Sequence, residues 1–387
     1  MNNNETLELI MGAFSSRTGL AELNKPGKLY LWTDAFAVCN FLELYHQTKN
    51  EDFKEMSLLL IDAVHSVLGH YHNDDYREGW ISGLDNGREH PTMGGLRIGK
   101  KLLERAPGEP YDEKKEWDRD GQYFHYLTKW MHALHQAAIV TKDVRYIRWA
   151  IELAKTAHKA FTYELADGTK RMYWKLSTDL SRPLISSMGQ HDALDAYITY
   201  LELTSTASDF SENADLSSEI EEVSVMAASI SMETEDSLGL GCLLINAAKA
   251  TQLIIMYKLP LEKLLTSLLD AAHKGIERFL QIGTLEYSAE YRLAYRELGL
   301  SIGLHGVKIM RNLLDAHAEK FEQKEVINEA LLRVEKYISL ADTIEDFWMI
   351  PKHQQSTTWD EHVDINSVML ATSLAPEGFL KIQRKGL

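Results

Sequence analysis

An alternation between two kinds of helical run constrains the fold of this chain more than any other feature. Apolar residues recur with a period near 3.6 along most of the sequence, and alternating strand patterns are scarce. The run 237–257 is apolar almost all round, whereas the run that follows, 260–281, is apolar on one face only. A helix that is apolar all round is buried, and a striped helix lies at a surface. The pattern therefore predicts an all-α protein with an inner and an outer layer of helices.

The helical runs come in pairs, which is typical of helical hairpins. The pairs are 32–47 with 51–70, 121–140 with 143–162, 190–204 with 214–231, 237–257 with 260–281, and 296–317 with 323–348. A sixth apolar run, 362–373, lies near the C-terminus, and we expect the N-terminal run, 5–18, to be its partner. This last pairing would close a ring of six hairpins by joining the two ends of the chain.

Longer links join one hairpin to the next. The links 71–120, 163–189, 282–295 and 349–361 each precede an inner-type helix. Long ordered loops inside a compact domain are usually functional. These links fall at the end where inner helices begin. We therefore expect a single domain over residues 1–387, with the functional loops gathered at one open end of the ring, its mouth.

This arrangement resembles the six-hairpin glycosidase-like superfamily of (α/α)6 toroids. That superfamily includes glycoside hydrolases, unsaturated glucuronyl hydrolases and N-acylglucosamine 2-epimerase-like isomerases, and no single family among them is matched. The resemblance covers nearly the whole chain and depends on architecture and on the composition of the helix starts. It implies a small-molecule saccharide substrate, bound in the funnel formed by the inner-helix starts and their loops. Fold alone does not fix the reaction.

Aromatic, acidic and histidine residues gather at these helix starts. Aromatic faces stack on sugar rings, and polar groups bond to sugar hydroxyls. The residues expected to bind substrate are Trp32, Asp34, Trp117, Tyr123, His125, Arg296, His305, Trp359 and Asp360. Ordinary structural roles compete with this interpretation, because Asp34 or Asp118 could cap a helix and Thr358 with Glu361 could form a capping box. Arg296 could bind a substrate carboxylate or phosphate, or neutralise Glu297.

A glycoside hydrolase is the leading interpretation of the acidic mouth. Glycosidic cleavage needs one carboxyl group that is protonated as the acid and a second that is ionised as base or nucleophile. We expect Asp120 or Asp118 to be the acid, and Asp192, Glu297 or Glu361 to be the second carboxylate. The sequence does not give their separation, so it leaves retention and inversion open.

Two alternatives stay open. A sugar epimerase or isomerase would move one proton next to a carbonyl, and histidine titrates in the right range for this task. The inner-helix histidines His125, His191, His305 and His362 could then carry the reaction. The other alternative is a non-catalytic toroid that binds a glycan or a protein.

The sequence predicts no metal and no other cofactor. His132 and His135 lie on the same helical face as His125, but a metal site needs a further ligand from elsewhere, and the chain has no HExxH motif. We therefore expect packing roles for His132 and His135.

Charge and composition limit the classes of molecule that this chain is expected to bind. The formal charge of −16 disfavours nucleic acid and anionic membranes. The stretch Met1–Glu5 lacks the features of a signal peptide, and no apolar run approaches a membrane span of about 18 residues. The two cysteines, Cys39 and Cys242, fit small buried hydrophobes. These features favour the cytoplasm and leave the oligomeric state open.

Overall fold

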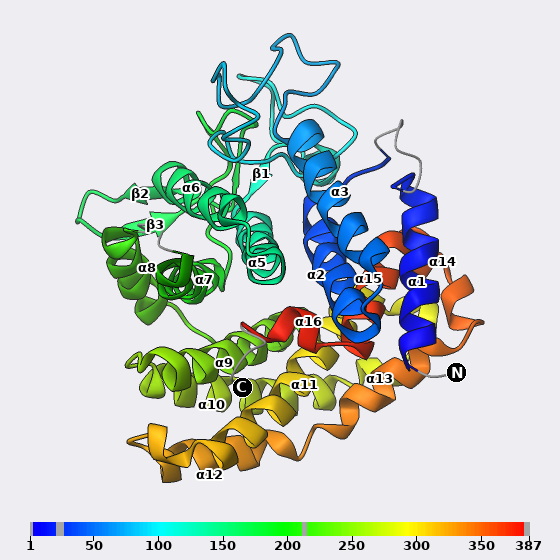
Figure 1. Ribbon diagram of the computed structural model, residues 1–387, viewed down its shortest axis with the longest axis vertical. Coiled ribbons are helices and arrows are strands. Elements are labelled where there is room, and N and C mark those ends of the chain that lie inside the picture. The colour runs from blue at the N-terminus through cyan, green and yellow to red at the C-terminus, as the bar shows by residue number, and fades with distance from the viewer. Residues whose placement is uncertain (1–2, 21–26, 211–214, 383–387) are drawn as a thin grey trace. The chain divides into compact units, whose positions relative to one another are not determined.

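A computed structural model describes residues 3–20, 27–210 and 215–382 (Figure 1). The chain divides into two compact units, Ser15–Ile230 and Met1–Phe14 with Ser231–Leu387. Two parts of the sequence-based expectations lie outside the described residues. They are Met1 and Asn2 of the N-terminal stretch, and residue 214, the expected start of a helix.

In the part of unit Ser15–Ile230 that the structure describes, the main helices form three hairpins. They are α2 (Leu31–Thr48) with α3 (Glu51–Leu68), α5 (Phe124–Thr141) with α6 (Val144–Phe161), and α7 (Asp192–Ala207) with α8 (Ser217–Ser229), together with the short α4 (Glu113–Asp118) and η1 (Ser208–Phe210). The inner helix α5 packs against both α2 and α7. Residues 31–44 of α2 are buried without a break, whereas α3 buries one face, as the two-layer pattern predicts.

Tight turns explain the short links within hairpins. The inner helices α2 and α5 end at Lys49 and Lys142, whose φ angles of 59° and 60° are left-handed. The next helix begins at once, capped by Asn50 and Asp143, whose side chains accept hydrogen bonds from backbone N–H groups of α3 and α6. These paired caps reverse the chain and set each outer helix antiparallel to its inner partner.

Two small antiparallel sheets flank the start of α5. One has the order β1 (Gln122–Tyr123), β4 (Lys175–Leu176), β5 (Pro183–Ile185), and the other pairs β2 (Thr162–Glu164) with β3 (Lys170–Met172). The sequence pattern did not predict them, because strands of two or three residues are too short to show alternation. Their pairing delays α5 to Phe124, three residues after the expected start at residue 121.

The second unit repeats the hairpin plan. Its described elements are the first part of α1 (Asn3–Thr18), α9 (Ser237–Tyr257), α10 (Glu262–Ile282), η2 (Thr284–Glu286), η3 (Ala289–Tyr291), α11 (Ala294–Ala316), η4 (Ala318–Lys320), α12 (Lys324–Glu335), α13 (Ser339–Met349), η5 (His353–Gln355), α14 (Thr357–Asp360), α15 (Val363–Leu374) and α16 (Glu377–Leu380). The single helix expected over 323–348 is wrong, because a turn between Glu335 and Ser339 divides it into α12 and α13.

Small residues allow α9 and α11 to approach closely. A Cβ added at Gly241 would lie only 2.0 Å from the carbonyl oxygen of Gly299, and one added at Gly303 would lie 2.8 Å from the carbonyl oxygen of Gly241. The glycines of these all-round apolar runs therefore serve backbone-to-backbone packing.

Helix α9 corrects one expectation from the sequence. It has 21 residues, and its most apolar 18-residue stretch has a mean hydropathy of 1.6, so by length and composition it could cross a membrane. However, 83% of its most apolar stretch is buried, and it packs against α10 and α11. Burial in the protein core accounts for this hydrophobicity.

The expected all-α class is confirmed: the described residues form mainly helices, paired as inner and outer members of hairpins. Residues 3–14 belong to the same unit as α15. The pairing of these two segments, the closed ring and the single domain stay predictions.

Candidate functional site

An acid and a base face each other where α5 and α7 begin, both in the unit Ser15–Ile230. His125 lies in the first turn of α5, and Asp192 is the first residue of α7. The Nδ1 atom of His125 is 3.8 Å from Oδ1 of Asp192. The His125 side chain keeps 27% of its surface exposed, whereas Asp192 keeps 6%. Nδ1 is buried without a hydrogen-bond partner, so the exposed part of the ring lies away from that atom.

Burial shifts both groups toward their neutral forms. It lowers the pKa of His125 to about 4, and the positive charge of Lys129 acts in the same direction. Burial raises the pKa of Asp192 to about 7, and the negative charge of Asp195 raises it further. The imidazole is therefore an unprotonated base at neutral pH, beside a carboxyl group that titrates near neutrality.

A second charged pair lies further along the contact between α5 and α7, which we call the α5–α7 seam. Lys129 of α5 donates a hydrogen bond of 2.7 Å to Asp195 of α7. Both side chains are mostly buried, and each sits one helical turn further into its helix than His125 or Asp192. This pair holds a fixed positive and a fixed negative charge next to the acid–base pair.

An aromatic wall surrounds His125. The ring of Trp174 stacks on the imidazole, with centroids 6.1 Å apart and an interplanar angle of 17°. Tyr123 and Tyr126 lie 5.4 and 4.8 Å from the imidazole centroid. Trp117, which is 50% exposed, meets Trp174 edge-on at 5.5 Å. The wall offers flat apolar faces beside the reachable edge of the base.

Sequence reasoning missed Trp174. It lies just before β4, in the link 163–189, and the backbone N–H of Phe124 donates to its carbonyl oxygen at 3.4 Å. The β1–β4 pairing thus brings this tryptophan to the start of α5. A tryptophan within one of the long inter-hairpin links was the available signal, but nothing in the sequence shows which helix start it joins.

Asp120, the residue first expected to be the catalytic acid, is engaged in structural contacts. It is 1% exposed and forms a buried ion pair with Arg97. Its Oδ1 atom also accepts hydrogen bonds of 3.1 Å from the backbone N–H groups of Gly99 and Gly121. These contacts fix the loop ahead of α5 and favour the structural interpretation of Asp120.

The other candidates in this unit have varied surroundings. Asp34 is buried and accepts a hydrogen bond from the backbone of Tyr30, which is the role of a cap. Trp32 is buried against Phe36 with centroids 4.5 Å apart. Asp118 is exposed, and His191, the N-cap residue of α7, is buried.

In the other unit, Glu297 is locked in a buried network. Arg292 binds both of its carboxylate oxygens, at 2.9 and 2.7 Å, and the indole N–H of Trp348 donates to Oε2 at 2.8 Å. Arg296 does not neutralise Glu297 but binds Asp236 at 2.6 Å. The alternative in which Arg296 neutralises Glu297 is therefore wrong, because the two residues belong to separate ion pairs.

The remaining candidates of this unit are divided between its core and its surface. His305 binds Glu345 at 2.6 Å, and the same carboxylate oxygen accepts from two serine hydroxyls. Trp359 is buried and stacked on Trp348. Asp360, Glu361 and His362 are exposed. The capping box expected from Thr358 to Glu361 is wrong, because the Ser356 side chain caps α14 by accepting from the backbone of Trp359.

Among the residues singled out from the sequence, the structure thus brings Tyr123, His125 and Asp192 together. Arg296, Glu297, His305 and the residues 359–362 lie in the other unit. Within the described residues, the His125–Asp192 pair is the arrangement that joins an accessible base, a partner acid and aromatic walls.

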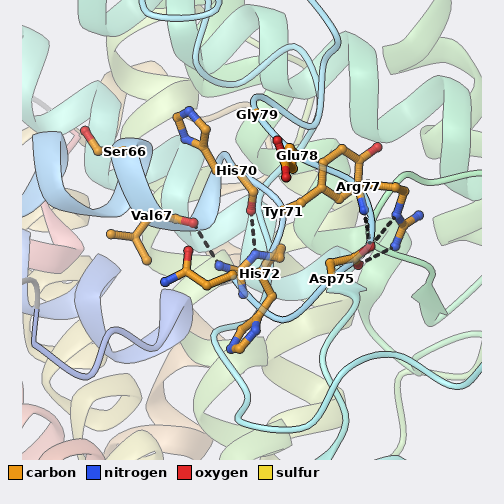
Figure 2. Close-up of a pocket in the computed structure, with 11 residues that line it drawn as sticks. Ser66, Val67, His70, Tyr71, His72, Asp75, Arg77, Glu78 and Gly79 are labelled. Carbon is orange, nitrogen blue, oxygen red and sulfur yellow. Dashed lines mark hydrogen bonds and ion pairs between the residues drawn. The ribbon is translucent and has the colours of Figure 1, made fainter.

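A separate pocket of about 530 Å³ lies at the end of α3 (Figure 2). Arg77 reaches toward Asp75 there and also binds Glu104 and Asp179. Arg97 donates to the backbone carbonyl groups of Val67 and His70 and pairs with Asp120. Acidic partners balance both arginines, and none of the candidate site residues lines this pocket.

No protein-family model matches this chain, and no curated protein matches it. The solved structure of cellobiose 2-epimerase from Spirochaeta thermophila is similar to it with a TM-score of 0.46 and 12% sequence identity, over 97% of this chain and 99% of that one.

Proposed function

We propose that the chain is a carbohydrate-active isomerase, specifically a sugar epimerase that works by proton transfer. The observation that carries the proposal is the His125–Asp192 pair at the start of two inner helices. An imidazole with a pKa of about 4 is unprotonated at physiological pH, and it is partly exposed. This alternative from the sequence replaces glycoside hydrolysis as the favoured reaction.

His125 is assigned the role of base. Its Nε2 atom removes the proton from the carbon next to the sugar's carbonyl group, leaving an enolate and an imidazolium. Asp192, 3.8 Å from Nδ1, balances the positive charge as its ionised carboxylate. The enolate then turns its opposite face toward His125, and the imidazolium returns the proton to the same carbon, which gives the epimer and regenerates the neutral base. General acid–base groups of this kind contribute about 10²–10⁴-fold to a rate.

The aromatic wall supports a saccharide as the substrate class. Trp174 stacks beside the base with the buried Tyr123 behind it, and the exposed Trp117 extends the aromatic surface. Sugar rings have apolar faces that stack on such side chains, while their hydroxyl groups stay free for polar contacts.

Glycoside hydrolysis fits the described carboxylates less well. Its two carboxyl groups flank the scissile bond, about 5–10 Å apart. Asp192 and Asp195 lie three residues apart on one helix and therefore approach a ligand from the same side. Glu297 is held by Arg292, as Asp120 is by Arg97.

A panel of reducing mono- and disaccharides tests the proposal. The products are separated by chromatography, so that an epimer is distinguished from the monosaccharides that hydrolysis releases. We expect epimer formation by the natural chain, and a loss of about 10²-fold or more in kcat for His125→Gln. His158→Gln is the matched control, because His158 pairs with Glu222 at 2.9 Å away from the α5–α7 seam. Hydrolysis without epimerisation would overturn the proposal.

A further inference from the structure

The seam between α5 and α7 holds a third cluster below the two pairs already described. His132 and His135 of α5 converge on Glu202 of α7, and all three side chains are 0–1% exposed. The Nδ1 atoms of His132 and His135 lie 2.6 and 2.8 Å from the same carboxylate oxygen, Oε1. One ligand atom from each residue lies within 4.8 Å of the others.

The geometry at His135 is that of a ligand with a supporting partner. Its Nε2 atom is 3.1 Å from the hydroxyl of Thr206. Its Nδ1 atom, although close to Glu202, is buried and makes no hydrogen bond. In metal sites, a histidine commonly binds the ion through one nitrogen while the other is held by an outer partner that fixes its tautomer.

We propose that His132, His135 and Glu202 form a buried binding site for a divalent transition-metal ion, with Zn²⁺ as the best match to two imidazoles and one carboxylate. These ligand types are those of protein zinc sites. A cation between them would also balance a carboxylate that is buried beside two imidazoles. Packing roles were expected for both histidines, because Glu202 lies about 70 residues away, on another helix.

The site would join α5 to α7 within one unit. Both helices also carry the acid–base pair at their starts, so a metal ion here would fix the helices that position His125 and Asp192. This role is structural and does not depend on the proposed epimerase activity. The competing arrangement is a hydrogen-bonded network in which protons alone lie between the three side chains.

Metal binding to the natural chain is the first test. The purified protein is stripped with a chelator, reloaded with Zn²⁺ or Co²⁺ and dialysed, and bound metal is measured by mass spectrometry. We expect about one ion per chain, a higher Tm on reloading, and visible absorption bands of Co²⁺ in a low-symmetry site. No retained metal and no Co²⁺ bands in the folded, full-length chain would overturn the proposal.

Variants then assign the ion to these residues. Thr206→Val removes only the outer hydroxyl and is expected to weaken metal binding by about 10–100-fold. His135→Gln is expected to abolish the Co²⁺ bands, whereas the matched control His158→Gln leaves them unchanged. If His135→Gln fails to fold, X-ray absorption on the Zn²⁺-loaded natural chain decides, with nitrogen and oxygen ligands expected at about 2.0–2.2 Å. Unchanged bands in His135→Gln, or sulfur ligands, would contradict the assignment.

Discussion

His125 Nδ1 lies 3.8 Å from Asp192 Oδ1, across the seam where two inner helices begin. Burial pushes the two pKa values in opposite directions, to about 4 for the histidine and to about 7 for the aspartate. At physiological pH the imidazole is therefore unprotonated and can accept a proton, while the aspartate titrates in this range. This relationship gives the candidate site its chemical character.

The pKa of Asp192 predicts a pH-dependent stability difference. A carboxyl group whose pKa is raised on folding contributes stability below its unfolded pKa of about 3.9, and that contribution is lost as pH rises through the folded pKa of about 7. Asp192→Asn removes the ionisation. We expect the variant to gain stability on the order of 4 kcal/mol over the natural chain at pH 8, at about 1.4 kcal/mol per unit of pKa. At pH 4 the two should be about equal.

Urea unfolding at the two pH values measures this difference. Asp195→Asn is the matched control, and its free energy of unfolding should change in the opposite direction. It removes the carboxylate that binds the buried Lys129 at 2.7 Å, so we expect it to destabilise the chain at both pH values. Equal stability of Asp192→Asn and the natural chain at pH 8 would show that Asp192 is not perturbed.

The rate of the proposed reaction should depend on the same carboxyl group. If the ionised Asp192 balances the imidazolium, activity rises with pH along a limb near pH 7. The charge of Asp195 raises the pKa of Asp192, so Asp195→Asn lowers that pKa and moves the limb to lower pH. The pH dependence of kcat/KM for both proteins tests this shift. A limb that stays in place in Asp195→Asn would contradict the assignment.

Trp174 is predicted to bind the substrate without taking part in proton transfer. Trp174→Ala removes the ring stacked on His125 and should raise KM about tenfold, in line with aromatic contacts of about 0.5–1.5 kcal/mol, while kcat changes little. Tyr173→Ala is the control, since Tyr173 stacks instead on Tyr163 at 4.2 Å. Steady-state kinetics on the turned-over sugar separates the two parameters. An unchanged KM for Trp174→Ala would remove the aromatic wall from the binding site.

Asp120 is predicted to matter for stability. Asp120→Asn breaks a buried ion pair and leaves Arg97 charged, which costs about 3–5 kcal/mol. We expect a lower midpoint of urea unfolding, and a folded fraction whose kcat is close to that of the natural chain. A loss of kcat of about 10²-fold in fully folded Asp120→Asn would return Asp120 to the role of acid.

The helical layers could be predicted from the sequence because each long run carries its own periodic signal. The run expected over 237–257 agrees with α9 at both ends. The strands β1 and β4 have two residues each and give no such signal, so the position of Trp174 could not be foreseen.

The site was predicted only in part, for a related reason. His125 and Asp192 stand at helix starts, where local sequence shows polar groups. Which acids are available, however, depends on partners that are distant in sequence. Asp120 looks like a free acid until the fold brings Arg97 to it, and Glu202 lies about 70 residues from the histidines it meets.

The central claim, that His125 transfers a proton at the carbon next to a sugar carbonyl, is tested most directly by hydrogen exchange. The protein is incubated with reducing sugars in D₂O, and nuclear magnetic resonance follows deuterium uptake at that carbon. We predict uptake with the natural chain and with His158→Gln, and its loss with His125→Gln. Uptake that persists in folded His125→Gln, or cleavage of a disaccharide with no uptake by the natural chain, would contradict the claim.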